Sequence, residues 1–235
     1  MHYIDAQSLS FKYERETVLE DISLYVAPGE FVILTGENGA AKSTLLRLLL
    51  GMLKPLSGKV SIRSTNRLGQ KLVTGYVPQQ VAAFNAGFPT TVEEFVRSGC
   101  FPQGRWFKRL TATDYTHIEK ALESVNMLDF RKKRIGSLSG GQKQRVCLAR
   151  MFACDPDLLI LDEPSTAMDK ASREQFYQLL QHEAQHHQKA ILMVTHDSDD
   201  LTGIADRQIH LVRKEDVPWR CFSLDSCNAH SSVHS

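Results

Sequence analysis

The spacing of apolar residues changes along this chain, and each spacing predicts a type of element. From residue 3 to 26, apolar and polar residues alternate, which is typical of antiparallel strands. EFVILTG (30–36), DLLILDEP (157–164) and KAILMVTHD (189–197) are near-continuous apolar runs, as in strands buried on both faces. A further strand is expected within 71–79.

Helical spacing occupies the segments between these runs. Apolar residues after position 42 recur at helical intervals until Pro55 and Gly58 stop the pattern. Residues 170–187 form an amphipathic segment between two apolar runs, and a strand–helix–strand order favours a parallel sheet with right-handed crossovers. TVEEFVRSG and DYTHIEKALESVNML indicate helices in the middle of the chain.

These patterns predict an α/β fold with three parts. The expected core comprises 1–81 and 156–212, and its N-terminal portion forms an antiparallel β subdomain. Residues 82–155 should form an inserted α-helical subdomain, because helical patterns dominate there and β-branched runs are few. Residues 213–235 are expected to be a C-terminal tail, which ends rich in Ser, Cys and His.

Composition limits the possible partners and location. A chain of 235 residues with a net charge of +1 suits one large domain with a subdomain, and has no global field that attracts nucleic acid or a membrane surface. No apolar run is long enough to span a membrane, and residues 1–16 lack a signal-peptide core. Five scattered cysteines suggest a reducing compartment. We therefore expect a cytoplasmic protein.

GENGAAKSTLL (36–46) follows the pattern of a phosphate-binding loop, except that Ala41 stands where the second glycine belongs. An isolated match could be an ordinary Gly-rich turn, but a predicted strand precedes this one and a predicted helix follows it. Backbone N–H groups and the helix dipole would bind phosphates, Lys42 would bridge the β- and γ-phosphates, and Ser43 would hold Mg²⁺. The predicted ATP-binding residues of this loop are Gly36, Glu37, Asn38, Gly39, Ala40, Ala41, Lys42, Ser43 and Thr44.

The alanine has two possible costs. If position 41 needs a left-handed backbone, the β-carbon costs about 1–2 kcal/mol. If the loop already turns into helix there, φ is negative and alanine costs little. Position 41 immediately precedes the expected helix, so we favour the second case and predict a working loop.

Two acids close the apolar run at 157–161. Asp162 at a strand end can reach Mg²⁺ through water, and Glu163 can polarise an attacking water. Both could instead be solvated acids. The direct sequence from an apolar strand into Asp162, Glu163 and Pro164 favours the catalytic interpretation.

LSGGQKQRVCLAR (138–150) resembles the signature motif of ATP-binding-cassette proteins. Other motifs of that family occur in order. Tyr13 matches the adenine-stacking aromatic, Gln79 in VPQ the Q-loop glutamine, and His196 in VTHD the switch histidine. STAMD resembles the D-loop and ends at Asp169. Alone, Tyr13 and His196 could be structural, but together these motifs cover nearly the whole chain.

The resemblance implies a P-loop NTPase fold with a RecA-like parallel core. It implies that two ATP molecules are sandwiched between two copies of the chain, with the signature of one copy facing the P-loop of the other. It also implies that Ser43, Gln79 and Asp162 serve Mg²⁺, and that Glu163, His196 and Gln79 serve hydrolysis. The implied signature residues are Ser139, Gly140, Gly141 and Gln142.

NAGFPTTVEEFV, LSGGQKQR and the LVRKEDVPWRCF ending resemble ATPase subunits of metal-ion importers, most of all the zinc-uptake type of Gram-positive bacteria. The implied partners are a second copy, integral membrane permease subunits and, indirectly, an extracellular metal-binding protein, without nucleic acid. The chain would lie on the inner face of the cell membrane. Its permease contact is expected after Gln79, where Phe84, Phe88 and Phe95 could equally be core residues.

Other functions stay open at this stage. A manganese or iron importer would have the same cassette. A soluble ATPase acting on DNA or ribosomes fits less well, because such proteins carry long insertions or two cassettes in one chain. A regulatory module without turnover has Ala41 as its only support.

Histidines and cysteines near the C-terminal end raise the question of a metal site. His182 and His186 have i, i+4 spacing, and His187 follows. Because the surrounding segment is hydrophilic, a solvated helix face is the favoured interpretation. A regulatory zinc site formed in the tail is the alternative, with candidate ligands at Cys221, Cys227, His230 and His234.

Overall fold

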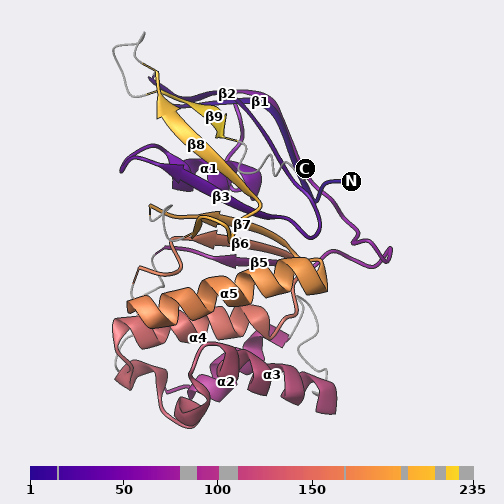
Figure 1. Ribbon diagram of the computed structural model, residues 1–235, viewed down its shortest axis with the longest axis vertical. Coiled ribbons are helices and arrows are strands. Elements are labelled where there is room, and N and C mark those ends of the chain that lie inside the picture. The colour runs from indigo at the N-terminus through magenta and orange to yellow at the C-terminus, as the bar shows by residue number, and fades with distance from the viewer. Residues whose placement is uncertain are drawn as a thin grey trace, which may run out of the picture.

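The computed structural model describes residues 1–14, 16–79, 89–100, 111–166, 168–196, 201–214 and 221–227. For residues 225–227 it describes the backbone only. Within these residues one sheet runs through the molecule in the order β4-β1-β2-β9-β8-β3-β7-β6-β5 (Figure 1). Its strands are β1 Ile4–Tyr13, β2 Glu16–Val26, β3 Phe31–Gly36, β4 Ser57–Ile62, β5 Thr74–Val77, β6 Leu158–Asp162, β7 Ala190–Val194, β8 Arg207–Arg213 and β9 Phe222–Cys227.

The central strands are parallel, as the strand–helix–strand order predicts. β3 pairs in parallel with β7 and β8, and β6 pairs in parallel with β5 and β7. Side chains of β3 alternate between two cores. Phe31 and Ile33 face one core, while Val32 and Leu34 face the other. Because both faces are covered, these strands are apolar at nearly every position.

Antiparallel pairs of β2 and β4 with β1 form the predicted β subdomain. Helix α1 (Lys42–Leu49) lies between this subdomain and the central strands, where Leu45, Leu46, Leu48 and Leu49 are fully buried or nearly so (Figure 1). The periodicity of the sequence therefore predicted the antiparallel strands of 3–26 and the burial of Leu45, Leu48 and Leu49, whereas the pairing of β4 was not predicted.

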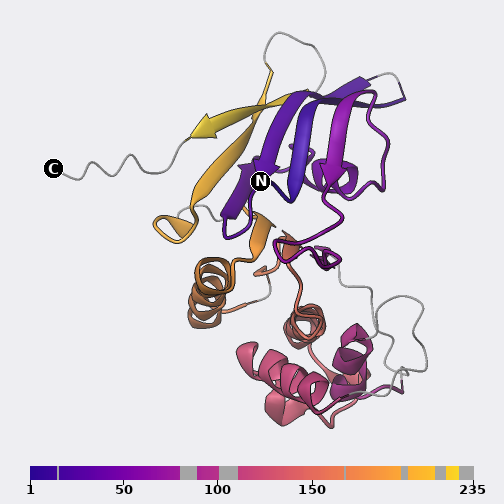
Figure 2. The ribbon, with the colours of Figure 1, turned by 90° about the vertical axis from the view of Figure 1, so that its right-hand side faces the viewer.

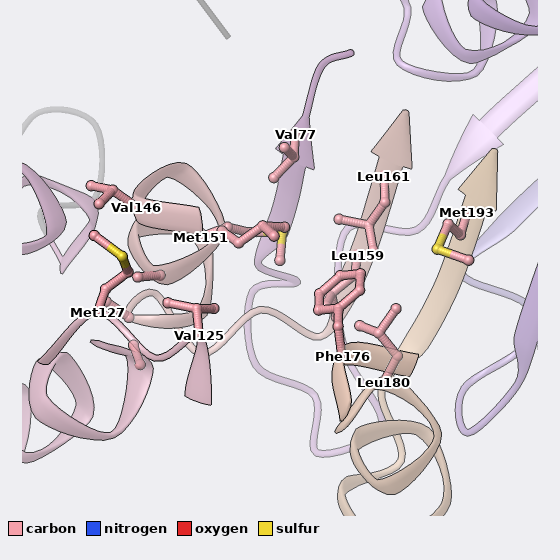
Figure 3. Close-up of a cluster of buried hydrophobic side chains, with 14 of the residues drawn as sticks. Val77, Val125, Met127, Val146, Met151, Leu159, Leu161, Phe176, Leu180 and Met193 are labelled. Atoms are coloured by element: carbon pink, nitrogen blue, oxygen red, sulfur yellow. The ribbon is translucent and has the colours of Figure 1, made fainter. Parts of the chain in front are cut away.

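The remaining helices cover the opposite face of the central sheet. α4 and α5 lie next to the strands, and α2 and α3 lie farther out, as the turned view shows (Figure 2). Figure 3 shows Phe176 and Leu180 of α5 beside Leu159 and Leu161 of β6. The helices are α2 Val92–Arg97, α3 Ala112–Ser124, α4 Gly140–Phe152 and α5 Lys170–His187, with 3-10 turns at Ser98–Cys100, Leu128–Phe130 and Ile135–Ser137.

The prediction of a tail from residue 213 is wrong for part of that segment. Strand β9 pairs antiparallel with β8, and Leu19 of β2 pairs with Phe222. Cys221 and Phe222 are fully buried. The physical reason is that this short segment fills the gap between β2 and β8, a long-range pairing that local spacing does not reveal. Strands β4 and β8 were not predicted either.

No helix among the described residues is long and apolar enough to cross a membrane.

Candidate functional site

Four predicted site segments follow the carboxyl ends of neighbouring parallel strands. The loop after β3 carries the P-loop, and Glu163 follows β6. His196 follows β7, and Gln79 follows β5. Because these strands are parallel, their carboxyl ends meet at one edge of the sheet, where ligands bind in open α/β sheets.

The P-loop curls around the amine of its lysine. Lys42 is only 7% exposed, and its Nζ donates to the carbonyls of Gly36 at 2.8 Å and Glu37 at 3.1 Å. Glu37, Asn38 and Gly39 are exposed, and the first turn of α1 holds no acidic side chain. The backbone N–H groups at the start of α1, together with Lys42, thus form a positive site suited to an anion.

Ala41 has a left-handed backbone, with φ 59° and ψ 22°, so the expectation of a negative φ is wrong. The helix does begin at Lys42 as predicted, but the residue before it caps the helix and is not part of it. Its carbonyl accepts the first helical bond, from Leu45 N–H at 2.9 Å. A β-carbon at this φ costs about 1–2 kcal/mol, so the alanine is a strained residue in an otherwise complete loop.

Asp162 presents an oxygen without a partner next to the loop. The residue is 3% exposed, and its Oδ1 is buried without a hydrogen bond. Burial raises the pKa of Asp162, while a hydrogen bond with Ser43 and the charge of Lys42 oppose that rise. An unpaired buried carboxylate oxygen beside a hydroxyl is the donor set that Mg²⁺ prefers. These residues therefore fit a magnesium ion.

Glu163 lies where the predicted catalytic residues meet. Gln79 Nε2 donates to its Oε2 at 2.7 Å, and Nδ1 of His196 lies 3.8 Å from the same oxygen. The Glu163 side chain is 12% exposed, whereas the imidazole of His196 is 48% exposed. Glu163 also has a positive φ of 49°. Strained backbone of this kind persists only where surrounding contacts hold it.

Tyr13 lies at the rim of the P-loop. Its ring is 45% exposed, and its hydroxyl lies 3.4 Å from the hydroxyl of Thr44. Phe11 contacts the ring edge-on, with 4.8 Å between centroids. A supported and exposed ring beside a phosphate site offers a face for a base to stack on.

The signature residues form the N-terminus of α4. Ser139 and Gln142 make a reciprocal capping box, in which each side chain accepts the backbone N–H of the other. Ser139 and Gly140 are exposed, and a β-carbon at Gly140 would meet nothing within 4 Å. The open start of this helix, with Gly141, is therefore accessible to a partner molecule.

Asp169 caps α5. Its carboxylate accepts from the backbone N–H of Ser172 at 2.9 Å and from the Ser172 hydroxyl at 3.0 Å, and these bonds lower the pKa of Asp169. The predicted D-loop acid thus has a structural task in this chain beside any role toward a partner.

One buried polar residue at the site was missed. Gln144 of α4 is 7% exposed and donates to the carbonyls of Glu163 and Pro164. The signal was present in the sequence, because Gln144 lies four and seven residues before Leu148 and Met151, a spacing that places all three on the buried face of one helix.

The histidines of α5 do not form a metal centre. His182, His186 and His187 are exposed, with ring centroids of His182 and His186 4.5 Å apart. Where the structure describes the chain, no group of three or more His, Cys, Asp or Glu side chains could hold a metal ion. The tail candidates His230 and His234 and the side chain of Cys227 lie outside the described residues.

Of the aromatics expected at a permease contact, only Phe95 lies within the described residues; Phe84 and Phe88 do not. Phe95 is partly buried and packs against the helical core, with the Arg150 guanidinium 5.1 Å from its ring centroid.

Comparison with known proteins identifies the family. Residues 19–166 match the family model described as ABC transporter. The chain is 58% identical over 224 residues to the zinc transport system ATP-binding protein AdcC of Streptococcus pneumoniae. The matched region covers 95% of this chain and 96% of that protein. It is 48% identical to the high-affinity zinc uptake system ATP-binding protein ZnuC of Bacillus subtilis, with 97% and 99% covered.

Solved structures agree with this result. A metal-chelate type ABC transporter in an inward-facing conformation has a TM-score of 0.77 at 28% identity, covering 96% of this chain and 84% of that one. A dimeric bacterial ABC transporter cassette has a TM-score of 0.73 at 25% identity, with 88% and 93% covered. The chain therefore belongs to the ATP-binding-cassette (ABC) transporter family and is an ATPase cassette of that family.

Proposed function

We propose that this chain is the ATP-hydrolysing subunit of an importer that takes up zinc. The observation that carries this proposal is the meeting of Lys42, Asp162 and Glu163 at one sheet edge, in a chain that is 58% identical to a zinc transport ATP-binding protein. A manganese transport ATP-binding protein of Halalkalibacterium halodurans is 35% identical, which favours zinc over the manganese alternative.

In this proposal ATP binds along the P-loop. The adenine stacks on Tyr13, and Lys42 exchanges its bonds to the loop carbonyls for the β- and γ-phosphates. Thr44, in the first turn of α1, has its hydroxyl next to that of Tyr13. Glu37, Asn38 and Gly39 would contribute through their backbone N–H groups.

Ser43 and Asp162 would hold Mg²⁺, with Gln79 completing the set from the neighbouring strand. When bound, the ion neutralises charge on the phosphates. It would also supply the partner that Asp162 Oδ1 lacks.

Glu163 is the proposed general base. Its carboxylate would accept a proton from the attacking water, and His196 would hold the γ-phosphate and the water in line. In the described state Gln79 occupies one oxygen of this carboxylate. Movement of Gln79 would therefore free the base when ATP is bound.

A second copy would complete each site. Ser139, Gly140, Gly141 and Gln142 would contact the γ-phosphate bound by the other copy, because their helix start is open and positive. Asp169 would lie at the same junction. The inserted helical part, 82–155, would carry this signature, and the core would comprise 1–81 and 156–212.

The remaining partners follow from the transport function. The cassette would dock on integral membrane permease subunits at the inner face of the cell membrane, near the segment after Gln79. An extracellular metal-binding protein would deliver the ion, and no nucleic-acid partner is expected.

The first test is Mg²⁺-dependent ATP turnover by the purified chain and by Glu163→Gln. We expect wild-type turnover, and at least a hundredfold loss in the variant with ATP binding retained. A variant that turns over like wild type would exclude Glu163 as the base.

The ion is tested in cells that lack the chain. Under metal chelation, the growth of these cells should be restored by a lower concentration of added zinc than of added manganese. Growth should also be restored by the gene for the wild-type chain but not by the gene for Glu163→Gln. Preferential rescue by manganese would support the alternative importer.

A further inference from the structure

A buried glutamine in the signature helix clamps the backbone of the proposed base. Gln144 Nε2 donates to the carbonyl of Glu163 at 3.2 Å and to that of Pro164 at 2.8 Å. A side-chain amide has two N–H donors, and here both are used on consecutive carbonyls. Gln144 is only 7% exposed, and hydrogen bonds are stronger in such a buried environment than in water.

The clamped segment needs support, because Glu163 has a left-handed backbone with φ 49°. Its N–H donates to the Val194 carbonyl at 3.0 Å, and its own carbonyl also accepts from Thr166 Oγ1 at 3.0 Å. These contacts come from β7 and from the turn itself. Gln144 adds the contact from α4, so the direction of the Glu163 carboxylate depends on where that helix lies.

The same helix begins with the open signature. Ser139 caps its N-terminus, and Gln144 lies little more than one turn further on. A helix moves as a rigid element over so short a length. A shift of the signature, caused by contact with another molecule, therefore reaches the carbonyls of Glu163 and Pro164 directly.

We propose that Gln144 is a positioning residue for ATP hydrolysis, which couples the signature helix of a subunit to the orientation of its own Glu163. This inference rests on the proposed function, in which Glu163 is the base and the signature contacts the nucleotide of a second copy. In this proposal Gln144 acts through the backbone of Glu163 and Pro164, whose carbonyls it contacts.

The alternative is that Gln144 only satisfies two buried carbonyls and stabilises the interface between α4 and β6. The chain contains a matched control for that role. Gln181 of α5 donates through its Nε2 to the consecutive carbonyls of Gly203 at 3.3 Å and Ile204 at 3.1 Å. These residues precede β8, whose start lies at the sheet edge opposite the catalytic residues.

The experiment compares Gln144→Met with Gln181→Met in the purified full chain. Methionine keeps the length of the side chain and removes both donors. For each variant, kcat and KM for Mg²⁺-dependent ATP hydrolysis, the dissociation constant for ATP, and the thermal unfolding midpoint are measured. Gln144→Asn is a milder second variant, because its amide is one methylene too short to keep both contacts, and it is measured in the same way if Gln144→Met does not fold.

We expect Gln144→Met to lower kcat about tenfold or more, with the ATP dissociation constant within twofold of wild type. Gln181→Met should also lower the unfolding midpoint, because it loses both bonds, and should leave kcat within twofold. Retained kcat in Gln144→Met would overturn the inference. Equal losses of kcat in both variants would also overturn it, because they would show a general structural effect.

Wild type and Glu163→Gln are measured alongside. If Glu163→Gln abolishes turnover while Gln144→Met keeps it, only the inference about Gln144 fails. If wild type does not hydrolyse ATP, or Glu163→Gln turns over like wild type, the proposed function fails and the inference fails with it.

Discussion

Gln79 donates its side-chain amide to Oε2 of Glu163 at 2.7 Å, which joins the strand-end residue of β5 to the proposed base after β6. The same oxygen lies 3.8 Å from Nδ1 of His196. The base is therefore fixed from both neighbouring strands.

This relationship predicts the effect of Gln79→Glu. Two carboxylates at hydrogen-bond distance cannot both be ionised at little cost, so they will share a proton that blocks the base. We expect kcat near neutral pH to fall about tenfold and to recover partly as the pH is raised. Gln79→Met serves as the control, since its deficit should not change with pH. Similar pH profiles for the two variants would contradict the shared proton.

The left-handed backbone of Ala41 predicts that Ala41→Gly stabilises the protein. Removing the β-carbon at φ 59° relieves strain, and the free energy of unfolding should rise by about 1 kcal/mol. For a chain of this size that corresponds to an increase of about 2–4 °C in the unfolding midpoint, measured by thermal denaturation.

Ala40→Gly is the matched control for that substitution. Ala40 is fully buried and does not have a positive φ, so its loss of a methyl group should lower the midpoint. Destabilisation by both glycines would show that the Ala41 side chain makes contacts worth more than its strain. ATP turnover of Ala41→Gly should equal or exceed that of wild type.

Asp162→Asn should separate stability from activity. Burial raises the pKa of Asp162 above its ordinary value near 3.8, so the ionised form is disfavoured in the fold. At neutral pH the neutral amide should therefore increase the free energy of unfolding of the apo chain by about 1 kcal/mol. Mg²⁺-dependent turnover should fall at least tenfold, because a carboxylate ligand is lost.

The sign of the pH dependence follows from that raised pKa. Between the ordinary pKa and the folded one, the native state binds more protons than the unfolded state, so the cost of Asp162 disappears as the pH falls. The stability advantage of Asp162→Asn over wild type, measured by urea unfolding, should thus shrink toward pH 4. An advantage that grows on acidification would contradict the assigned cause.

Tyr13 should affect binding of ATP and not its hydrolysis. Loss of base stacking in Tyr13→Ala is worth about 1–3 kcal/mol, so KM should rise at least fivefold with kcat unchanged. Tyr13→Phe keeps the ring and should resemble wild type in steady-state kinetics. Tyr115 of α3 is 48% exposed, and Tyr115→Ala is the control for removing a similarly exposed ring elsewhere. An increase in KM for Tyr115→Ala would remove the support for stacking at Tyr13.

Local spacing was sufficient to predict β3, β5, β6 and β7 of the central sheet, α1, α5 and the antiparallel start of the chain. Alternation with a period of two, and apolar residues on one face of a helix, are properties of neighbouring residues, so they are visible without the fold. The order of the motifs also placed the P-loop, the acid pair and His196 after strands. Their roles as site residues stay predictions until turnover is measured.

Features that depend on long-range contacts were decided by the tertiary structure alone. Strand β9 exists because β2 and β8 leave room for it, and the buried Phe222 lies within a segment that resembled a tail. The φ angle of Ala41 is set by the path of the loop, which brings the carbonyls of Gly36 and Glu37 to the amine of Lys42. The neighbouring residues in the sequence do not reveal the sign of this angle. Gln144 can donate to the carbonyls of Glu163 and Pro164 only because the fold brings α4 next to the end of β6. The sequence by itself determined the order of the motifs and the elements with a strong local pattern. The tertiary structure decided the strands that form by long-range pairing, the strained backbone of Ala41 and the contacts that Gln144 makes.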